Sequence, residues 1–230
     1  ISSLGIDKNK VVHIPNGVDL NWFDNNYKKD FNNNNNLKKY FKNNEGIIFS
    51  YTGAHGKANG LKTLVEAARI IKEKKINNIN LLLVGSGPRK QELINLAKKY
   101  NLENIEFLPR VNKNEVPKIL SHSDVCISIV KESKVHKYGV SMNKLFDYMA
   151  SGKPMISALK AAFDFADVAE CGFAIPPNNA KKLAAAMIKM ANTSEEKRSE
   201  LGNNGRKYVE KNYDYPVLAN KLLKVINDLL

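Results

Sequence analysis

Two short segments of the sequence carry residue types that can bind a charged ligand. The first, residues 52–60, holds three glycines and directly precedes a helical pattern. Glycines let the backbone approach a ligand closely, and free amides at a helix N-terminus favour an anion. The spacing fits neither the dinucleotide-binding motif nor the P-loop. We interpret the segment as an anion-binding loop, with an ordinary turn as the alternative; His55 within it is either a ligand contact or merely an exposed side chain.

The second segment, residues 139–147, leads into another helical pattern. Ser141 is a suitable N-cap for this helix, and the amides from Val140 to Asn143 would face a ligand. Lys144 and Asp147 are three residues apart and share one face of the helix. They could form a surface ion pair. Alternatively, the cation binds a diphosphate and the carboxylate accepts hydrogen bonds from ribose hydroxyls.

The elements that must position these segments alternate along the chain. Apolar runs predict strands over 47–51, 79–84, 105–108, 125–130, 155–156 and 173–175. Helical patterns cover 61–75, 90–100, 114–121, 142–150 and 164–169, and continue from residue 180 with breaks near Thr193, Gly202 and Pro216. This alternation predicts an α/β fold, a Rossmann-like doubly wound parallel sheet of five or six strands with a C-terminal helical tail. Ligands of such sheets bind beyond the carboxyl ends of the strands, where both segments lie.

The first 45 residues are less regular. Pro15, Asn16 and Gly17 predict a turn. The polar, Asn-rich stretch 21–45 predicts a poorly specified surface excursion that ends in a short helix over 37–42.

Composition narrows the class of protein. The 230 residues are 43% hydrophobic and 26% charged, which excludes a disordered, collagen-like or membrane-embedded chain. The net charge of +13 favours an anionic partner, although 31 Lys and 30 Asn also fit codon drift in an AT-rich genome. Cys126 and Cys171 give neither a disulfide framework nor a metal spacing, and Cys126 is expected to fill the core. With no signal peptide and no apolar run near ~20 residues, we expect a cytoplasmic protein.

An ordered set of short motifs resembles one family. The motifs are IPNGVD at 14–19, YTG at 51–53, LLVGSGP at 82–88, FLP at 107–109, DV at 124–125 and MASGKP at 149–154. Together they resemble the C-terminal, donor-binding half of a GT-B glycosyltransferase of the group 1 (family 4) type. TGAHG at 52–56 and SMNKLFDYM at 141–149 resemble its bacterial surface-polysaccharide subset (O-antigen, capsule). Donors such as N-acetylfucosamine are typical of that subset.

The resemblance implies transfer of a sugar from a UDP-linked donor to a saccharide or lipid-linked acceptor, without a metal or other cofactor. Residues Arg110 and Val111 would frame the base. The donor-binding residues that we expect are Gly53, His55, Gly56, Asn59, Arg110, Val111, Val140, Ser141, Asn143, Lys144 and Asp147. The candidates for a catalytic role are His55, Lys144 and Asp147.

The sequence departs from the family pattern at the phosphate and sugar contacts. Ala54 and Asn59 stand where the family carries an Arg and a Lys. Gly139 and Asp147 stand where it carries two glutamates, so the first carboxylate is missing and the second has a shorter reach. The side chains available in their place are Lys144 and Lys57 as cations, and His55, Glu132 and His136 toward the sugar.

The family also implies a second domain. We expect residues 1–45 to be a leading segment of this domain, 46–205 its Rossmann-like core, and 206–230 helices that dock on an N-terminal acceptor domain. The chain would then be an excised part that binds the donor without turnover. Peripheral association with the inner face of the cell membrane is expected, and binding of nucleic acid is not. Two alternatives stay open: a UDP-sugar 2-epimerase on the same fold, and a non-catalytic basic module that binds anionic lipid or nucleic acid.

Overall fold

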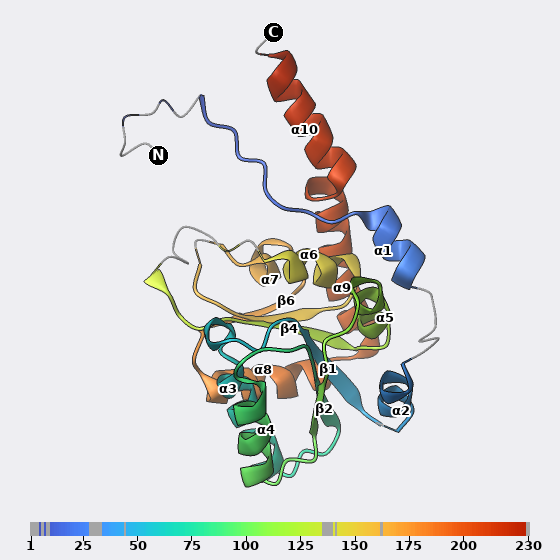
Figure 1. The fold of residues 1–230 in the computed structure, drawn as a ribbon, viewed down its shortest axis with the longest axis vertical. Coiled ribbons are helices and arrows are strands. Elements are labelled where there is room, and N and C mark those ends of the chain that lie inside the picture. Colours follow the sequence, from blue (N-terminus) through green and yellow to red (C-terminus); the bar gives the residue numbers. More distant parts are fainter. Residues whose placement is uncertain are drawn as a thin grey trace.

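One parallel sheet with helices on both faces forms the body of the molecule (Figure 1). The computed structural model describes residues 5, 7, 10–27, 34–43, 45–134, 140, 142–161 and 163–228. Six strands pair in the order β3-β2-β1-β4-β5-β6, and every pair is parallel. They are β1 (Ile47–Thr52), β2 (Ile79–Val84), β3 (Ile105–Leu108), β4 (Val125–Ile129), β5 (Met155–Ala158) and β6 (Gly172–Ile175). The predicted doubly wound sheet is confirmed.

The helices cover the sheet in two layers. One face packs against α3 (Leu61–Glu73), α4 (Lys90–Lys99) and α8 (Ala180–Ala191). The other face packs against α1 (Leu20–Tyr27), α2 (Asn35–Asn43), α5 (Val116–Ser121), α6 (Asn143–Ala150), α7 (Phe165–Val168) and α9 (Glu195–Asn212). The remaining elements are α10 (Tyr215–Asn227) and two short 3₁₀ turns, η3 (Lys57–Asn59) and η4 (Lys113–Glu115). From residue 46 to 191 the predicted strands and helices agree with these bounds to within two residues.

Continuous apolar strands follow from burial on both faces. In β4, Ile127 belongs to the core under α3 and α8, whereas Cys126 belongs to the core under α6 and α9. Cys126 is fully buried, as expected for a core residue, and this burial raises the pKa of its thiol to about 12.

The short helix expected over 37–42 is confirmed as α2, whereas residues 21–27 differ from the predicted excursion because they lie in α1, which is anchored to the core. In α1, Leu20 and Phe23 are buried three residues apart, and in α2, Leu37 and Tyr40 repeat the same spacing. Two apolar residues on one helix face suffice for packing, but so short a pattern is difficult to recognise in a sequence that is otherwise polar.

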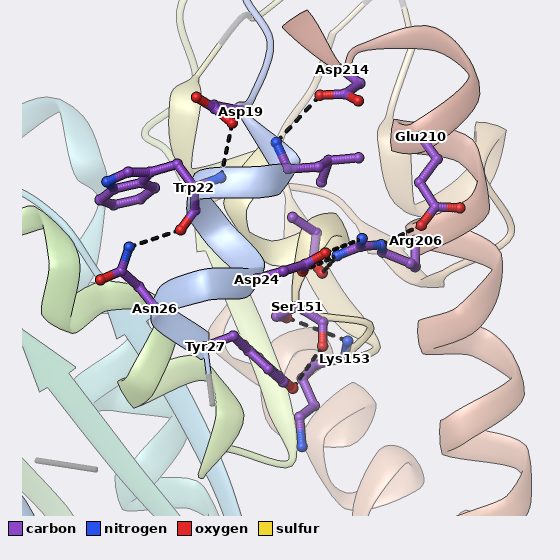
Figure 2. Close-up of polar contacts among 12 residues, drawn as sticks. Asp19, Trp22, Asp24, Asn26, Tyr27, Ser151, Lys153, Arg206, Glu210 and Asp214 are labelled. Atoms are coloured by element: carbon purple, nitrogen blue, oxygen red, sulfur yellow. Dashed lines mark hydrogen bonds and ion pairs between the residues drawn. The ribbon is translucent and has the colours of Figure 1, made fainter. Parts of the chain in front are cut away.

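Polar contacts fix α1 to the opposite end of the chain (Figure 2). The Arg206 guanidinium on α9 donates hydrogen bonds to both carboxylate oxygens of Asp24, at 2.7 and 2.8 Å, and to Glu210 at 2.6 Å. The Tyr27 hydroxyl donates to the Ser151 carbonyl just after α6, at 2.9 Å. Residues before the sheet and after it therefore belong to one packed unit.

The predicted turn at residues 15–17 is wrong. The chain is not turned there, and Val18 forms an isolated parallel bridge with Asp214. A Cβ atom at Gly17 would clash with the carbonyl oxygen of Tyr213. The glycine serves the close approach of two segments rather than a change of direction.

The predicted break at Gly202 is also wrong, because α9 continues through this residue and past residue 206. Gly202 is buried, and a Cβ atom there would clash with the Gly152 carbonyl oxygen. The chain changes direction only near Tyr213 and Asp214, ahead of Pro216.

Helix α10 extends away from the sheet (Figure 1). Among its described residues only Leu218 is buried, while Leu222, Leu223 and Ile226 are 43–54% exposed. None of the helices that the structure describes combines the length and apolar character that a membrane span needs.

We predict that Gly202→Ala lowers the free energy of unfolding by about 1–3 kcal/mol, because the added methyl overpacks the contact with Gly152. The exposed neighbour Asn203 provides the matched control, since Asn203→Ala changes only helix propensity and leaves stability within about 0.5 kcal/mol. Urea denaturation measures both. A Gly202→Ala chain as stable as the parent would show that the two backbones separate freely.

Candidate functional site

The carboxyl ends of the strands open into two adjoining hollows of about 510 and 470 Å³. The larger lies between the loops after β1, β2 and β3, and the smaller lies at the start of α6. Both are lined by Thr52, Gly53, Val116 and Asn143, so they form one cleft, which we call the carboxyl-edge cleft. This is the edge at which open parallel sheets bind their ligands.

Six of the predicted donor-binding residues line this cleft. They are Gly53, Arg110, Val111, Asn143, Lys144 and Asp147. The predicted residues that are described but do not line it are His55, Gly56, Asn59 and Val140. Ser141 lies outside the described residues. The cleft therefore unites the start of α6 with loops that are distant in sequence.

A close backbone contact holds two of these loops together. The His55 amide donates a hydrogen bond to the Ser86 carbonyl at 2.8 Å. A Cβ atom at Gly85 would clash with the Gly53 carbonyl oxygen. Gly53 itself has a φ of +143°, which residues with a side chain rarely adopt. The glycines of both motifs are thus needed to bring the loops after β1 and β2 into contact.

The His55 imidazole is buried beneath this contact rather than exposed to the cleft. Its exposed fraction is 0%, and its ring lies near the rings of Tyr51 and Phe107. Among the described residues neither ring nitrogen has a hydrogen-bond partner. Burial, aided by the positive charges of Lys90 and Lys144, lowers the pKa of His55 to about 4. The ring is therefore neutral at pH 7, and in this arrangement only the main chain of His55 shapes the loop.

Lys144 is a half-buried cation at the edge of the cleft. Its Nζ donates a hydrogen bond to the Tyr51 hydroxyl at 2.9 Å and lies 4.0 Å from the centre of the Tyr51 ring. Burial lowers the pKa of Lys144 to about 8, because the charged form loses hydration. No carboxylate of the described residues forms an ion pair with it. An anion entering the cleft would supply the missing negative charge.

Asp147, one turn further along α6, is also half-buried and forms no ion pair with any of the described residues. Burial raises the pKa of its carboxyl to about 6, and the nearby Lys113 opposes that shift. Asp147 and Lys144 do not form the surface ion pair that their spacing allows. Two opposite charges thus line one cleft while each lacks a partner of its own among the described residues.

The start of α6 adds uncapped backbone amides to the cleft. The helix begins at Asn143 with Met142 at the N-cap position, and no side chain of the described residues is seen to cap it. The expected N-cap, Ser141, lies outside the described residues. The Asn143 side chain accepts a hydrogen bond from the Asn16 amide nitrogen at 3.1 Å, which brings the leading segment to the cleft.

Other candidates lie away from the cleft. Gly56 and Lys57 line a separate hollow of about 330 Å³ beside the start of α3. Glu132 forms an exposed ion pair with Lys160 at 3.0 Å. His136 and Gly139 lie outside the described residues. No cluster of three or more His, Cys, Asp or Glu side chains in the described part of the chain could hold a metal ion.

Sequence reasoning missed three residues of this site. Tyr51 was expected in a strand and in the YTG motif, but not as a contact of Lys144, whose Nζ donates to its hydroxyl. Lys113 lines the cleft directly after the loop 109–112. Asn16 belongs to a motif that was interpreted as a turn. The available signal was the position of Lys113, which closely follows Arg110 and Val111, two residues already expected at this edge; the sequence carried no such signal for Asn16 or Tyr51.

We predict that Lys144→Met raises the free energy of unfolding at pH 7 by on the order of 1–2 kcal/mol, because it removes a buried charge without an ionic partner. The unfolded chain retains the Lys144 proton up to about pH 10.5, whereas the folded chain releases it near pH 8. The stability of the parent chain therefore rises over this pH range, and the variant lacks this contribution.

Urea denaturation between pH 7 and 10.5 measures this difference. The exposed Lys62 offers the matched control, since Lys62→Met leaves stability within about 0.5 kcal/mol. A Lys144→Met chain that is less stable than the parent at every pH would refute the claim that the unpaired charge of Lys144 destabilises the folded chain.

Comparison with known proteins identifies the family to which this chain belongs. Residues 32–208 match the model described as "Glycosyl transferases group 1". CapM of Staphylococcus aureus, a capsular polysaccharide biosynthesis glycosyltransferase, is 26% identical over 81% of this chain and 47% of its own length. WcaL of Escherichia coli, a proposed colanic acid biosynthesis glycosyltransferase, is 24% identical over 74% of this chain and 42% of its own.

The fold also resembles a solved structure, that of Anabaena HepE with UDP and glucose. The TM-score is 0.77 at 16% identity, over 99% of this chain and 59% of that one. The chain spans less than half the length of the two curated relatives. The family model covers most of the chain, and the chain therefore belongs to the group 1 glycosyltransferases.

Proposed function

We propose that this chain is the donor-binding half of a glycosyltransferase that uses a UDP-linked sugar. The observation that carries the proposal is Lys144, a half-buried cation that lacks an ionic partner among the described residues and stands in the first turn of α6, at the carboxyl-edge cleft. A helix N-terminus and a lysine together suit a diphosphate. HepE, solved with UDP and glucose, has the same fold and supports this choice of ligand.

The two hollows suit the parts of such a donor. The diphosphate would lie at Gly53, Lys144 and the first amides of α6. The ribose would lie at Asp147, whose carboxylate can accept hydrogen bonds from two hydroxyls. The base would occupy the larger hollow near Arg110 and Val111.

Transfer breaks the bond between the anomeric carbon and the diphosphate oxygen and forms one from that carbon to an acceptor hydroxyl oxygen, whose proton is released. Negative charge is left on the departing UDP. Fixed amides and a cation stabilise that charge without reorganising during the reaction. Lys144 and the start of α6 would take this role. His55 would affect the reaction through the loop that it supports, because its imidazole is buried.

The donor sugar and acceptor are inferred from the motifs and the relatives. The motifs at 52–56 and 141–149 favour an N-acetylated amino sugar, such as N-acetylfucosamine. CapM and WcaL, named for capsular polysaccharide and colanic acid biosynthesis, favour a saccharide or lipid-linked acceptor of a surface polysaccharide. The net charge of +13 would assist peripheral association with the inner face of an anionic membrane.

We further propose that α10 docks on a preceding acceptor domain of the same protein. Its exposed apolar residues have no partner in the described structure, and the two curated relatives are more than twice as long as the region that they share with this chain. The chain alone would bind the donor but not transfer the sugar.

We predict that UDP binds this chain and raises its melting temperature, since a ligand that binds only the folded state stabilises it. Lys144→Met and Asp147→Asn should each weaken binding by about tenfold or more, whereas Lys62→Met leaves it unchanged. Titration calorimetry with UDP, GDP and ADP measures the affinities. The absence of any response to millimolar nucleotide would overturn the donor site.

We predict that Leu223→Asp leaves the stability and UDP affinity of this chain unchanged, because the side chain is 54% exposed. In the full-length protein the same change should separate calorimetric unfolding into two transitions, because an apolar interface is lost. Asn220→Asp, which adds the same charge at an exposed polar position of α10, is the control. Unchanged unfolding of the full-length Leu223→Asp protein would argue against docking through α10.

A further inference from the structure

Tyr51 occupies an unusual position for a core residue. Its side chain is fully buried and lines neither hollow, yet its hydroxyl is bonded to Lys144, which lines the carboxyl-edge cleft. The hydroxyl donates a hydrogen bond to the Ala54 carbonyl at 2.8 Å. Because a tyrosine hydroxyl has a single proton, this bond leaves its lone pairs to accept from the Lys144 ammonium at 2.9 Å. The direction of both hydrogen bonds is therefore fixed.

The space around the ammonium is closely bounded. The Tyr51 ring lies 4.0 Å from Nζ, in the range of a cation–π contact. On another side, a Cβ atom at Gly53 would lie 2.7 Å from Nζ. The ring, the hydroxyl and the bare backbone of Gly53 thus form a recess that fits an ammonium group.

This recess contacts the Lys144 ammonium but supplies no negative charge to neutralise it. Of the titratable groups nearby, the His55 imidazole is neutral at pH 7 and Lys90 is a like charge. Asp147 lies on the same helix but forms no ion pair with Lys144, and burial raises the pKa of Tyr51, so its hydroxyl stays neutral. An ammonium has three donors, and Tyr51 is the hydrogen-bond acceptor found for it among the described residues. Two donors remain for a ligand.

We propose that Tyr51 is a positioning residue of the donor site, which holds the Lys144 ammonium against Gly53 so that its remaining donors meet the diphosphate. The inference rests on the proposed function. Holding the flexible lysine in advance removes the conformational entropy that binding would otherwise lose. The neutral acceptor also helps to keep the amine protonated at physiological pH.

Tyr51→Phe tests this role, because it keeps the ring and removes only the hydroxyl. UDP affinity, measured by calorimetry at pH 7, should fall about tenfold. In the parent chain the affinity should decrease as the pH rises through about 8, where free Lys144 loses its proton. In Tyr51→Phe this decrease should begin at a lower pH, because the ammonium has lost its acceptor.

Tyr100→Phe is the matched control, since it removes a hydroxyl that donates to Glu66 away from the cleft. It should change neither the affinity nor the pH midpoint. Equal UDP binding by Tyr51→Phe and the parent would overturn the proposal. So would weaker binding with an unmoved midpoint, which indicates a structural role alone.

Lys144→Arg provides a second test that leaves the core intact. The planar guanidinium does not fit a recess shaped for an ammonium, so UDP binding should stay as weak as in Lys144→Met. Recovery of parental affinity by arginine would show that only a positive charge is needed, and the positioning role would be refuted even if Tyr51→Phe failed to fold.

A ligand-free measurement separates this inference from the proposed function. The ¹³Cε resonance of Lys144, followed by NMR, should titrate near pH 8 in the parent and lower in Tyr51→Phe. If the parent binds no UDP but this shift occurs, the proposed donor is wrong and the recess is real. If UDP binds and the titration is unchanged by the substitution, the positioning role alone fails.

Discussion

The contact between the loops after β1 and β2 is the constraint on which the cleft depends. Neighbouring parallel strands deliver these loops to the same edge, but side chains would ordinarily keep them apart. Glycine at position 85 removes that obstacle, and the His55 amide then bonds to the Ser86 carbonyl. The same contact buries the imidazole and places Gly53 beside Lys144. The recess around the Lys144 ammonium therefore depends on position 85 being a glycine.

The charged side chains of the cleft lack ion-pair partners among the described residues, whereas Arg206, outside the cleft, has them. Arg206 has two acidic partners and joins α1 to α9, whereas Lys144 and Asp147 form no ion pair with any described residue although burial shifts the pKa of each. Each raises the free energy of the folded state, since burial disfavours the charged form. Unpaired charges of this kind are characteristic of a ligand-binding site. They lower the stability of the empty protein, and the bound ligand supplies the missing partners.

Much of the fold could be predicted from the sequence, because strand burial on both faces leaves continuous apolar runs. The exceptions share one cause: they depend on contacts between distant segments. Gly17 and Gly202 look like breaks in sequence, and only their neighbours Tyr213 and Gly152 show that they permit close packing. Likewise, the importance of Lys144 was visible from its place on a helix, whereas its partner Tyr51 lies 93 residues earlier and resembled a core residue.

The lowered pKa of Lys144 also has a chemical consequence. With a pKa of about 8, on the order of a tenth of these amines are unprotonated at pH 7, against fewer than about one in a thousand for an ordinary lysine. The neutral amine is a nucleophile. We therefore expect Lys144 to react with an aldehyde or an activated ester more readily than an ordinary lysine, and a bound anion would both cover it and return its proton. The same unpaired Lys144 amine that would bind a phosphate group would therefore also react with electrophiles when the cleft holds no ligand.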